Sequence, residues 1–250
     1  MENDFNNSAC TIIEIPLWEP KWNRESLLAH LERVGVVAFN RGLRNVALSN
    51  KDRTFPSFEK CLDYNLKIAD VYKKEFPIFC GVDLAPKKRK GTCIFTLAKD
   101  IKHKKFIPID IRYGKWTGPK LVEEMEAIQK IYNPRSFLVE NNALQDMVID
   151  FIKAKNKNAG NKMMIKGFCT GSNKLDVNTG LPSLEVDFYN NDWIIPMGDR
   201  THGVGCKCSF CAWKEEVIGH PLHEITDGLM ASWFAKQNSK SSLIGRIRIL

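Results

Sequence analysis

From residue 77 onward the chain alternates predicted strands and helices in an order that constrains its fold. The strand-like runs PIFCGVDLA, GTCIFTLA and KFIPIDIRY follow one another with short links, which favours antiparallel pairing. A helical stretch, KLVEEMEAIQKIY, then alternates with the strand SFLVE, the helix ALQDMVIDFIKAK and a fifth strand, MMIKGF. We therefore predict an α/β protein with a mixed central sheet, three antiparallel strands followed by parallel strands, flanked by helices.

The two helices of this region are predicted from their apolar stripes and end signals. Gly118 and Pro119 open the first helix, and Asn133 with Pro134 stops it. Asn141 or Asn142 is expected to cap the second helix. Further on, SLEVDFYNND reads as a short helix and DWIIP as an extended piece. The inward-facing positions are expected to be Leu121, Met125, Ile128, Tyr132, Leu144, Met147, Val148 and Phe151.

The chain divides by composition into three parts. Residues 1–76 are irregular and too thin in apolar residues to hold a core, and we expect an N-terminal extension. Residues 77–236 carry the strand and helix pattern and are the expected domain. Residues 237–250 are expected to form a basic C-terminal tail.

Three acidic residues far apart in the chain lie where a strand ends or a helix begins. Asp83 closes PIFCGVDLA, Glu140 closes SFLVE, and Asp227 lies at the start of the amphipathic stretch HEITDGLMASWFA. Carboxylates placed in this way can converge on one edge of a sheet. Together they would suit hard divalent cations such as Mg²⁺ or Mn²⁺, the chemistry of metal-dependent phosphodiester cleavage.

Each acid also has an ordinary structural interpretation. Asp83 could pair with a cation of the following basic turn, and Glu140 could complement the next helix dipole. Asp227 could complement the dipole of the helix in whose first turn it lies. If that helix already runs through His223 and Glu224, these two side chains would share a face with Asp227 and could join a metal site. The basic turn contains Lys87, Lys88, Arg89 and Lys90.

The chain is basic, with formal net charge +8 and a pI of about 9.0. This charge fits a polyanionic partner such as nucleic acid, or simply a well-solvated surface. The basic turn after Asp83 is correspondingly either a contact to DNA phosphates or a solvated hairpin turn. No apolar run reaches membrane-spanning length and the N-terminus is polar, so we expect a cytoplasmic protein.

The eight cysteines in such a chain indicate thiols or metal ligands in place of disulfides. Cys80, Cys93 and Cys169 lie in apolar runs and are expected to be core residues. Three further cysteines lie close together in one loop-like stretch that also contains histidines. This stretch is either a zinc site, because thiolates and imidazoles are typical zinc ligands, or a cluster of reduced thiols on a loop. The candidate zinc ligands are His202, Cys206, Cys208, Cys211 and His220, with His223 as an alternative to His220.

The order of the acids, first strand, fourth strand and late helix, resembles the RNase H-like nucleases. More specifically, residues 15 to 236 resemble the C-terminal nuclease domain of a tailed-phage terminase large subunit. The resemblance rests on fragments that follow one another in the family's order, each weak alone. They are LWEPKWNRESLLAHLERVGVVAFNRGL, GVDLA, GKWTGPKLVEEMEAIQKIYNPRSFLVENNALQ, TGSNK, GLPSLEVDFYNNDWIIPMGD and HEITDGLMASWFA.

The resemblance implies a metal-dependent endonuclease that cuts concatemeric double-stranded phage DNA during packaging. Asp83 would then bridge two divalent ions, Mg²⁺ or Mn²⁺, with Glu140 and Asp227 each completing one shell. The side chains of Asn141, Asn142 and Gln145 would support these ligands. The implied partners are double-stranded DNA, the terminase ATPase portion, the small terminase subunit and the portal, in the host cytoplasm and not the mature virion.

Two departures from the family limit this expectation. No G-x-x-x-x-G-K-[ST] motif occurs, so the chain is expected to be the nuclease half without the ATP-driven motor. Where the family has aspartates before its last acid, this chain has His223 and Glu224. Two alternatives stay open: a nuclease of the junction-resolvase or transposase type, or a non-catalytic, zinc-stabilised module for DNA binding or assembly.

Overall fold

The computed structural model of the chain separates into two compact units, Met1–Asp52 and Arg53–Leu250. It describes residues 53–84, 91–116, 118–140, 162–168, 179–203, 205–223 and 225–241, together with 25, 26, 28, 29, 151, 152 and 156. In the first unit, the described residues 25, 26, 28 and 29 are helical.

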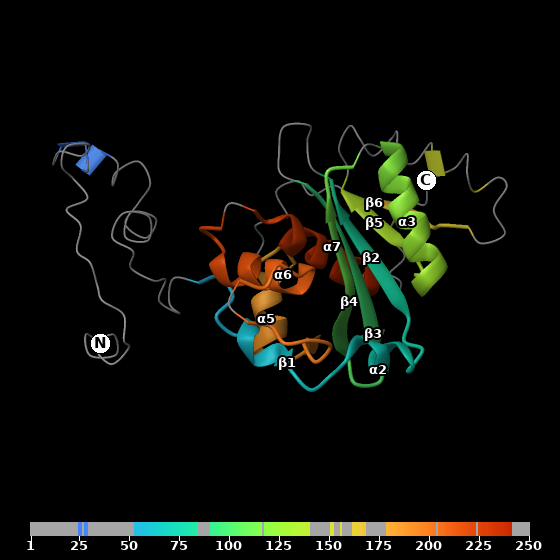
Figure 1. The fold of residues 1–250 in the computed structure, drawn as a ribbon, viewed down its shortest axis with the longest axis horizontal. Coiled ribbons are helices and arrows are strands. Elements are labelled where there is room, and N and C mark those ends of the chain that lie inside the picture. Colours follow the sequence, from blue (N-terminus) through green and yellow to red (C-terminus); the bar gives the residue numbers. More distant parts are fainter. Residues whose placement is uncertain are drawn as a thin grey trace. The chain divides into compact units, whose positions relative to one another are not determined.

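A five-stranded mixed sheet with the order β4-β3-β2-β5-β6 forms the centre of the second unit (Figure 1). β2 pairs antiparallel with β3, and β3 with β4, as the short links between them predict. β2 pairs parallel with β5, and β5 with β6. This confirms the predicted fold class. The strands are β2 (Ile78–Asp83), β3 (Thr92–Asp100), β4 (Lys105–Gly114), β5 (Phe137–Glu140) and β6 (Ile165–Phe168).

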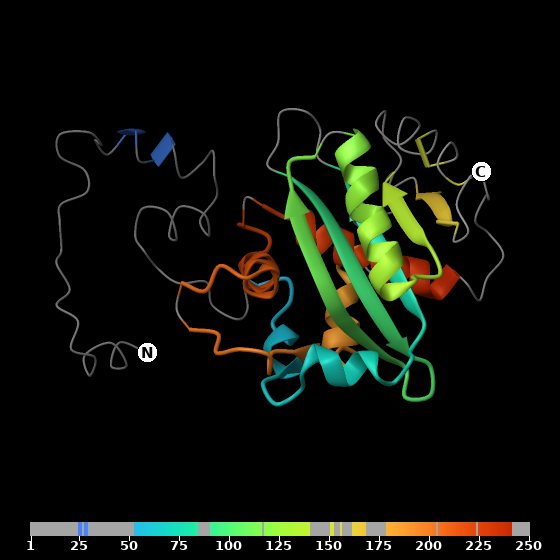
Figure 2. The ribbon, with the colours of Figure 1, turned by 45° about the vertical axis from the view of Figure 1, so that its right-hand side comes forward.

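Helix α3 (Gly118–Tyr132) covers one face of this sheet, and α7 (Asp227–Ser241) crosses the other (Figure 2). The apolar stripe of α3 packs on side chains of β2 and β5 that point the same way, including Val82 and Val139. Asn133 follows α3 with a φ of 46°, in the left-handed region where asparagine is tolerated, and ends the helix as predicted. Cys80 and Cys93 are fully buried in the core, which confirms their predicted role.

Helix α7 lies unusually close to β2 because Gly81 has no side chain. A Cβ at Gly81 would collide with the backbone of Ala231 and Ala235. The contact is fixed by Asn238, whose Nδ2 donates to the carbonyl oxygens of Cys80 (3.0 Å) and Ser136 (2.8 Å). β2 and α7 are therefore held in one fixed orientation relative to each other.

The segment 53–76, assigned from sequence to the N-terminal extension, packs within the same compact unit as the sheet. Phe58 is fully buried and makes edge-to-face contacts with Phe188 and Trp213. Helix α7 runs to Ser241, so it includes the first residues of the segment 237–250 that was assigned from sequence to the C-terminal tail. The remaining elements are η2 (Phe58–Cys61), β1 (Leu62–Asp63), α2 (Ile68–Tyr72), α5 (Ser183–Tyr189), β7 (Ile195–Pro196) and α6 (Ser209–Gly219).

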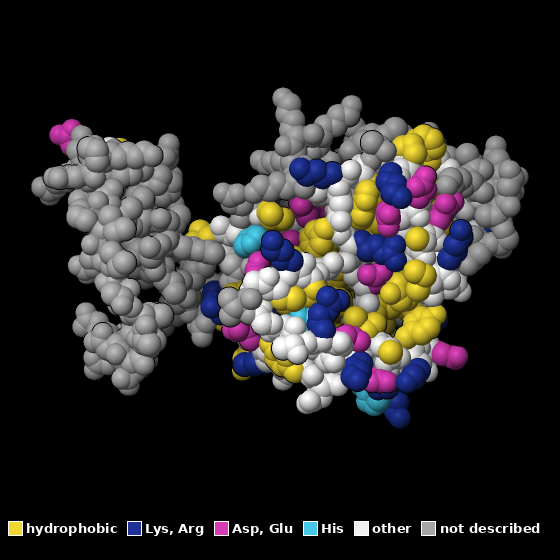
Figure 3. Space-filling view, viewed as in Figure 1, with side chains coloured by type: hydrophobic (Ala, Val, Ile, Leu, Met, Phe, Trp, Pro, Cys, Tyr) yellow, Lys and Arg dark blue, Asp and Glu magenta, His cyan; other side chains and the backbone are white. Residues whose placement is uncertain are grey.

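The surface of the described residues is mixed in charge. On the face shown in Figure 3, Lys and Arg side chains are interspersed with acidic ones. Within the described part of the chain, every helix is too short or too polar to cross a membrane.

Candidate active site

Asp83 and Glu140 end two neighbouring parallel strands. The last paired residues of β2 and β5 are Val82 and Val139, so the two acids occupy the next position of each strand. Neighbouring strands lie about 4.8 Å apart, and successive side chains point to opposite faces. The structure thus places the two predicted acids side by side at the carboxyl edge of the sheet.

Asp83 points to the face of the sheet that α7 covers. Val82, one residue earlier, packs into the cluster beneath α3, whereas Gly81 lies directly against α7. Because side chains alternate along a strand, Asp83 shares the face of Gly81. The missing side chain at Gly81 leaves room for the backbone of α7 on this face.

Glu140 points to the same face by the same alternation. Val139 packs in the cluster beneath α3, and Leu138 packs in the cluster that contains α7. Glu140 therefore follows Leu138 toward the α7 side. Both strand-end carboxylates are partly exposed, so water and a ligand can reach them.

Asp227 is the first residue of α7 and approaches from the β3 side of Asp83. Its Oδ2 lies 3.8 Å from the position that a Cβ on Gly91 would take, just before β3 begins. Cys93 on β3 pairs with Asp83 across the strands. Burial raises the pKa of the Cys93 thiol well above its usual range, and the charges of Glu216, Asp83 and Asp227 add to the rise. The charges of carboxylates on β2, α6 and α7 therefore all act on one buried thiol.

Glu216 is a carboxylate in this region that the sequence analysis missed. It lies on α6, is only 2% exposed, and its Oε2 accepts a hydrogen bond from the backbone N–H of Leu229 (2.9 Å). Burial raises the pKa of Glu216 to about 7, and the charge of Asp227 contributes to the increase. The sequence does contain an indication that Glu216 is buried. It lies three residues after Trp213 and next to Val217, on the buried stripe of α6.

The donor chemistry at this edge fits divalent cations that prefer oxygen. Carboxylate oxygens are the ligands of Mg²⁺ and Mn²⁺, and Asp83 lies between Glu140 on β5 and Asp227 on the β3 side. Among the described residues, the three acids are not in a group whose ligand atoms all lie within 4.8 Å of one another.

Other predicted participants are placed elsewhere or lie outside the described residues. The condition under which His223 would share a helix face with Asp227 is not met, because α7 begins at Asp227. The Nδ1 of His223 lies 2.6 Å from the carbonyl oxygen of Ile225. Outside the described residues lie Glu224, Asn141, Asn142, Gln145, Lys87, Lys88, Arg89, Lys90 and Cys169.

The structure brings four of the five candidate zinc ligands together. The ligand atoms of His202, Cys206, Cys208 and Cys211 all lie within 4.8 Å of one another. His220, the fifth candidate, is not part of this group. Its Nδ1 lies 2.7 Å from Thr54 Oγ1 and its ring packs on Phe55.

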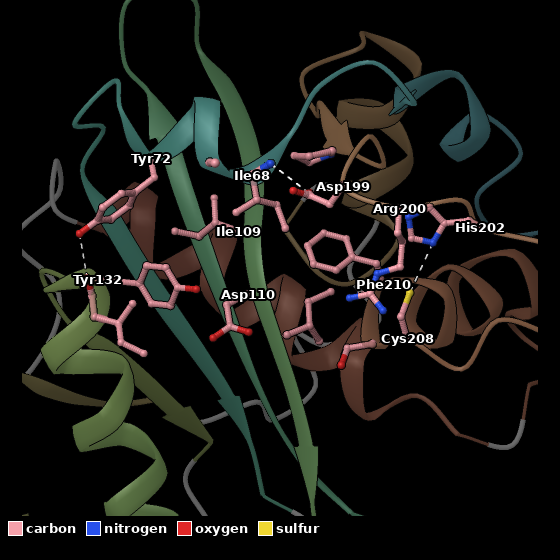
Figure 4. Close-up of a pocket in the computed structure, with 15 residues that line it drawn as sticks. Ile68, Tyr72, Ile109, Asp110, Tyr132, Asp199, Arg200, His202, Cys208 and Phe210 are labelled. Atoms are coloured by element: carbon pink, nitrogen blue, oxygen red, sulfur yellow. Dashed lines mark hydrogen bonds between the residues drawn. The ribbon is translucent and has the colours of Figure 1, made fainter.

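A pocket of about 560 Å³ lies between β4, α2 and the loop that precedes α6 (Figure 4). Asp110 and Tyr132 line one side, and Arg200, His202 and Cys208 line the other. None of Asp83, Glu140 and Asp227 lines this pocket. It is therefore separate from the candidate active site and borders the cysteine cluster.

The mixed sheet, with antiparallel strands first, parallel strands after them and a helix on each face, is an RNase H-like arrangement. Among solved structures, the human cytomegalovirus terminase nuclease domain matches with TM-score 0.56 at 10% identity, covering 82% of this chain and 100% of that domain. A manganese-soaked form of that domain gives TM-score 0.55 at 10% identity, covering 78% and 98%. The chain thus has the fold of a viral terminase nuclease domain. No family model and no curated protein sequence matches it.

Proposed function

We propose that this chain is the nuclease of a viral DNA-packaging machine, an endonuclease that cuts concatemeric double-stranded DNA with divalent cations. The observation that carries the proposal is the placement of the acids. Asp83 and Glu140 end adjacent parallel strands on one face of the sheet, and Asp227 opens the helix that crosses that face. The fold agrees with this assignment, because the similar structures are nuclease domains of a viral terminase.

Asp83, Glu140 and Asp227 are the proposed metal ligands. Asp83 would contact both ions because it is central, and Glu140 and Asp227 would each contact one. Bound there, Mg²⁺ or Mn²⁺ supplies an activated water and stabilises the leaving 3′ oxygen. Manganese is supported by the manganese-soaked structure of the cytomegalovirus domain.

The other residues of the site hold these ligands in place. β2 fixes the backbone of Asp83 between two paired strands, and Asn238 ties α7 to the same strand through the Cys80 carbonyl. Glu216 holds the first turn of α7, where Asp227 begins. Rigid placement of this kind is what metal-dependent phosphodiester cleavage requires of its ligands.

The proposed nucleic-acid partner is supported by the net charge of +8. The basic residues Lys87, Lys88, Arg89 and Lys90 follow Asp83 directly in sequence and are proposed to contact DNA phosphates. A terminase ATPase portion, a small terminase subunit and a portal are the proposed protein partners.

A cleavage assay on supercoiled plasmid with Mn²⁺ or Mg²⁺ tests the activity. We expect nicking and linearisation by the wild-type chain, and a loss of at least about 100-fold in Asp83→Asn, which keeps the shape but removes the charge. Glu123→Gln is the matched control, since Glu123 is an exposed acid on α3. Intact plasmid with folded wild-type protein, or full activity in Asp83→Asn, would refute the nuclease assignment.

A second arm of the assay tests the substrate class. Linear duplex and a four-way junction of the same sequence are offered in competition. A packaging nuclease is expected to cut both without preferring the branch. Strong preference for the junction would favour a resolvase.

A further inference from the structure

We propose that His202, Cys206, Cys208 and Cys211 form a structural zinc site that ties the loop before α6 to the helix itself. This site is separate from the carboxylates and does not depend on nuclease activity. Three soft thiolates and one imidazole are a donor set that selects Zn²⁺ over Mg²⁺ or Mn²⁺.

The distances around His202 fit one shared ion. Its Nδ1 lies 3.2 Å from Cys211 Sγ, 3.5 Å from Cys208 Sγ and 3.9 Å from Cys206 Sγ. A tetrahedral zinc with its usual bond lengths to sulfur and nitrogen separates those ligand atoms by about 3.6 Å. The three separations bracket this value.

Hydrogen bonding alone does not account for the arrangement. A single ring nitrogen has one proton or one lone pair in the ring plane, so it can pair well with only one of the three sulfurs. Disulfide bonding does not account for it either, because Cys206, Cys208 and Cys211 are free thiols. An ion shared by all four side chains satisfies the three sulfurs and the nitrogen together.

The local backbone presents the ligands in the manner of a zinc knuckle. Cys208 caps α6, and its sulfur accepts a hydrogen bond from the backbone N–H of Cys211 (3.4 Å). Gly205, with φ of 80°, lies in a turn between His202 and Cys206, in which the N–H of Cys206 donates to the carbonyl oxygen of Gly203 (3.1 Å). Backbone N–H groups that bond a ligating sulfur orient it and stabilise its charge.

The cluster is reachable from solvent but is not an open catalytic centre. His202, Cys206 and Cys208 are partly exposed, whereas Cys211 is buried. His202 and Cys208 border the pocket in Figure 4, which gives an ion a path to the site. Four protein ligands close a tetrahedral shell, so the zinc would serve structure and not chemistry.

The site lies at the start of the helix that supports the carboxylates. Two turns further along α6, Glu216 accepts the hydrogen bond from Leu229 in the first turn of α7. We expect zinc to fix the N-terminal end of α6, and through Glu216 the start of the helix that begins with Asp227.

Metal content tests the proposal directly. The wild-type chain, expressed with zinc and purified without chelator, is expected to hold about one zinc per chain by mass spectrometry. Asp83→Asn is expected to keep this zinc, which separates the site from the carboxylates. Cys208→Ser and His202→Ala are expected to lose most of it, and Cys61→Ala, at a buried cysteine outside the cluster, to keep it.

A second measurement covers the case in which the variants fail to fold. Chelation of the wild-type protein is expected to lower Tm by about 5 °C or more, and zinc, but not Mg²⁺, to restore it. Cobalt in place of zinc should give the visible absorption of a tetrahedral thiolate site. Less than about 0.1 zinc per folded wild-type chain, or full zinc content in folded Cys208→Ser, would overturn the proposal.

Discussion

Glu216 accepts a hydrogen bond from the backbone N–H of Leu229 across the junction of α6 and α7 (2.9 Å). Leu229 is the third residue of α7, so its N–H has no partner within the helix. A carboxylate from a neighbouring helix thus accepts a hydrogen bond from one of the N–H groups that the first turn of α7 leaves without a helical partner. The start of α7, and with it Asp227, depends on a buried acid outside its own sequence.

We predict that Glu216→Gln changes how stability depends on pH. Burial raises the pKa of Glu216 from 4.5 to about 7, so the folded protein binds this proton more tightly than the unfolded chain. The contribution of the group to stability is greatest below pH about 4.5 and is lost as pH rises to about 7. As the pH rises through that window, the free energy of unfolding of the variant should rise relative to that of wild type, by on the order of 3 kcal/mol at most.

Urea unfolding between pH 4.5 and 8 in metal-free buffer checks this prediction. Glu215→Gln is the matched control, because Glu215 is the exposed neighbour on the same helix. If the free energy of unfolding depended on pH equally in wild type and in Glu216→Gln, the raised pKa of Glu216 would be contradicted. Glutamine keeps an acceptor for Leu229, so cleavage should survive in this variant and fail in a folded Glu216→Ala.

The periodicity of the sequence was sufficient to predict the sheet, α3 and the positions of Asp83 and Glu140. Short links and apolar alternation are local properties, and they set strand direction and side-chain face. Neither the role of Glu216 nor the packing of residues 53–76 in the same unit as the sheet could be read from the sequence, because both depend on contacts between distant segments. Phe58 finds its partners at Phe188 and Trp213, which no local pattern reveals.

We predict that Gly81→Ala is destabilising out of proportion to its size. Its methyl group would meet the backbone of Ala231 and Ala235, which cannot move aside as a side chain can. Overpacking of this kind costs about 1–3 kcal/mol, and shifting α7 should also lower cleavage by displacing Asp227. Thermal unfolding measures the cost. Gly203→Ala should be neutral, since nothing lies within 4 Å of its added Cβ.

We predict that Asn238→Ala weakens the attachment of α7 to the sheet. Asn238 is fully buried, and its side chain donates to Cys80 O and Ser136 O while accepting from Ser136 Oγ (2.7 Å). Leaving such buried groups without these bonds costs about 1–3 kcal/mol. Hydrogen exchange should show faster opening of α7. Gln237→Ala, which removes an exposed bond to Thr179, should have little effect.

Lys236 is the strongest candidate for a large loss of stability on α7. It is fully buried and pairs with Asp187 of α5, while its Nζ also donates to Ser183 Oγ (3.1 Å). Burial lowers the pKa of Lys236 to about 8, and the charge of Asp187 opposes that shift. Lys236→Met would leave the Asp187 charge without this partner, at a cost of about 3–5 kcal/mol.

A double-mutant cycle measured by urea unfolding checks the prediction for Lys236. Lys236→Met with Asp187→Leu should recover much of the loss, because neither charge is then left unpaired in the core. Lys240→Met on the last turn of α7 is the control, since Lys240 is exposed. If the double variant were as unstable as the sum of the single ones, the two side chains would not be coupled and the pair would not hold α7 to α5.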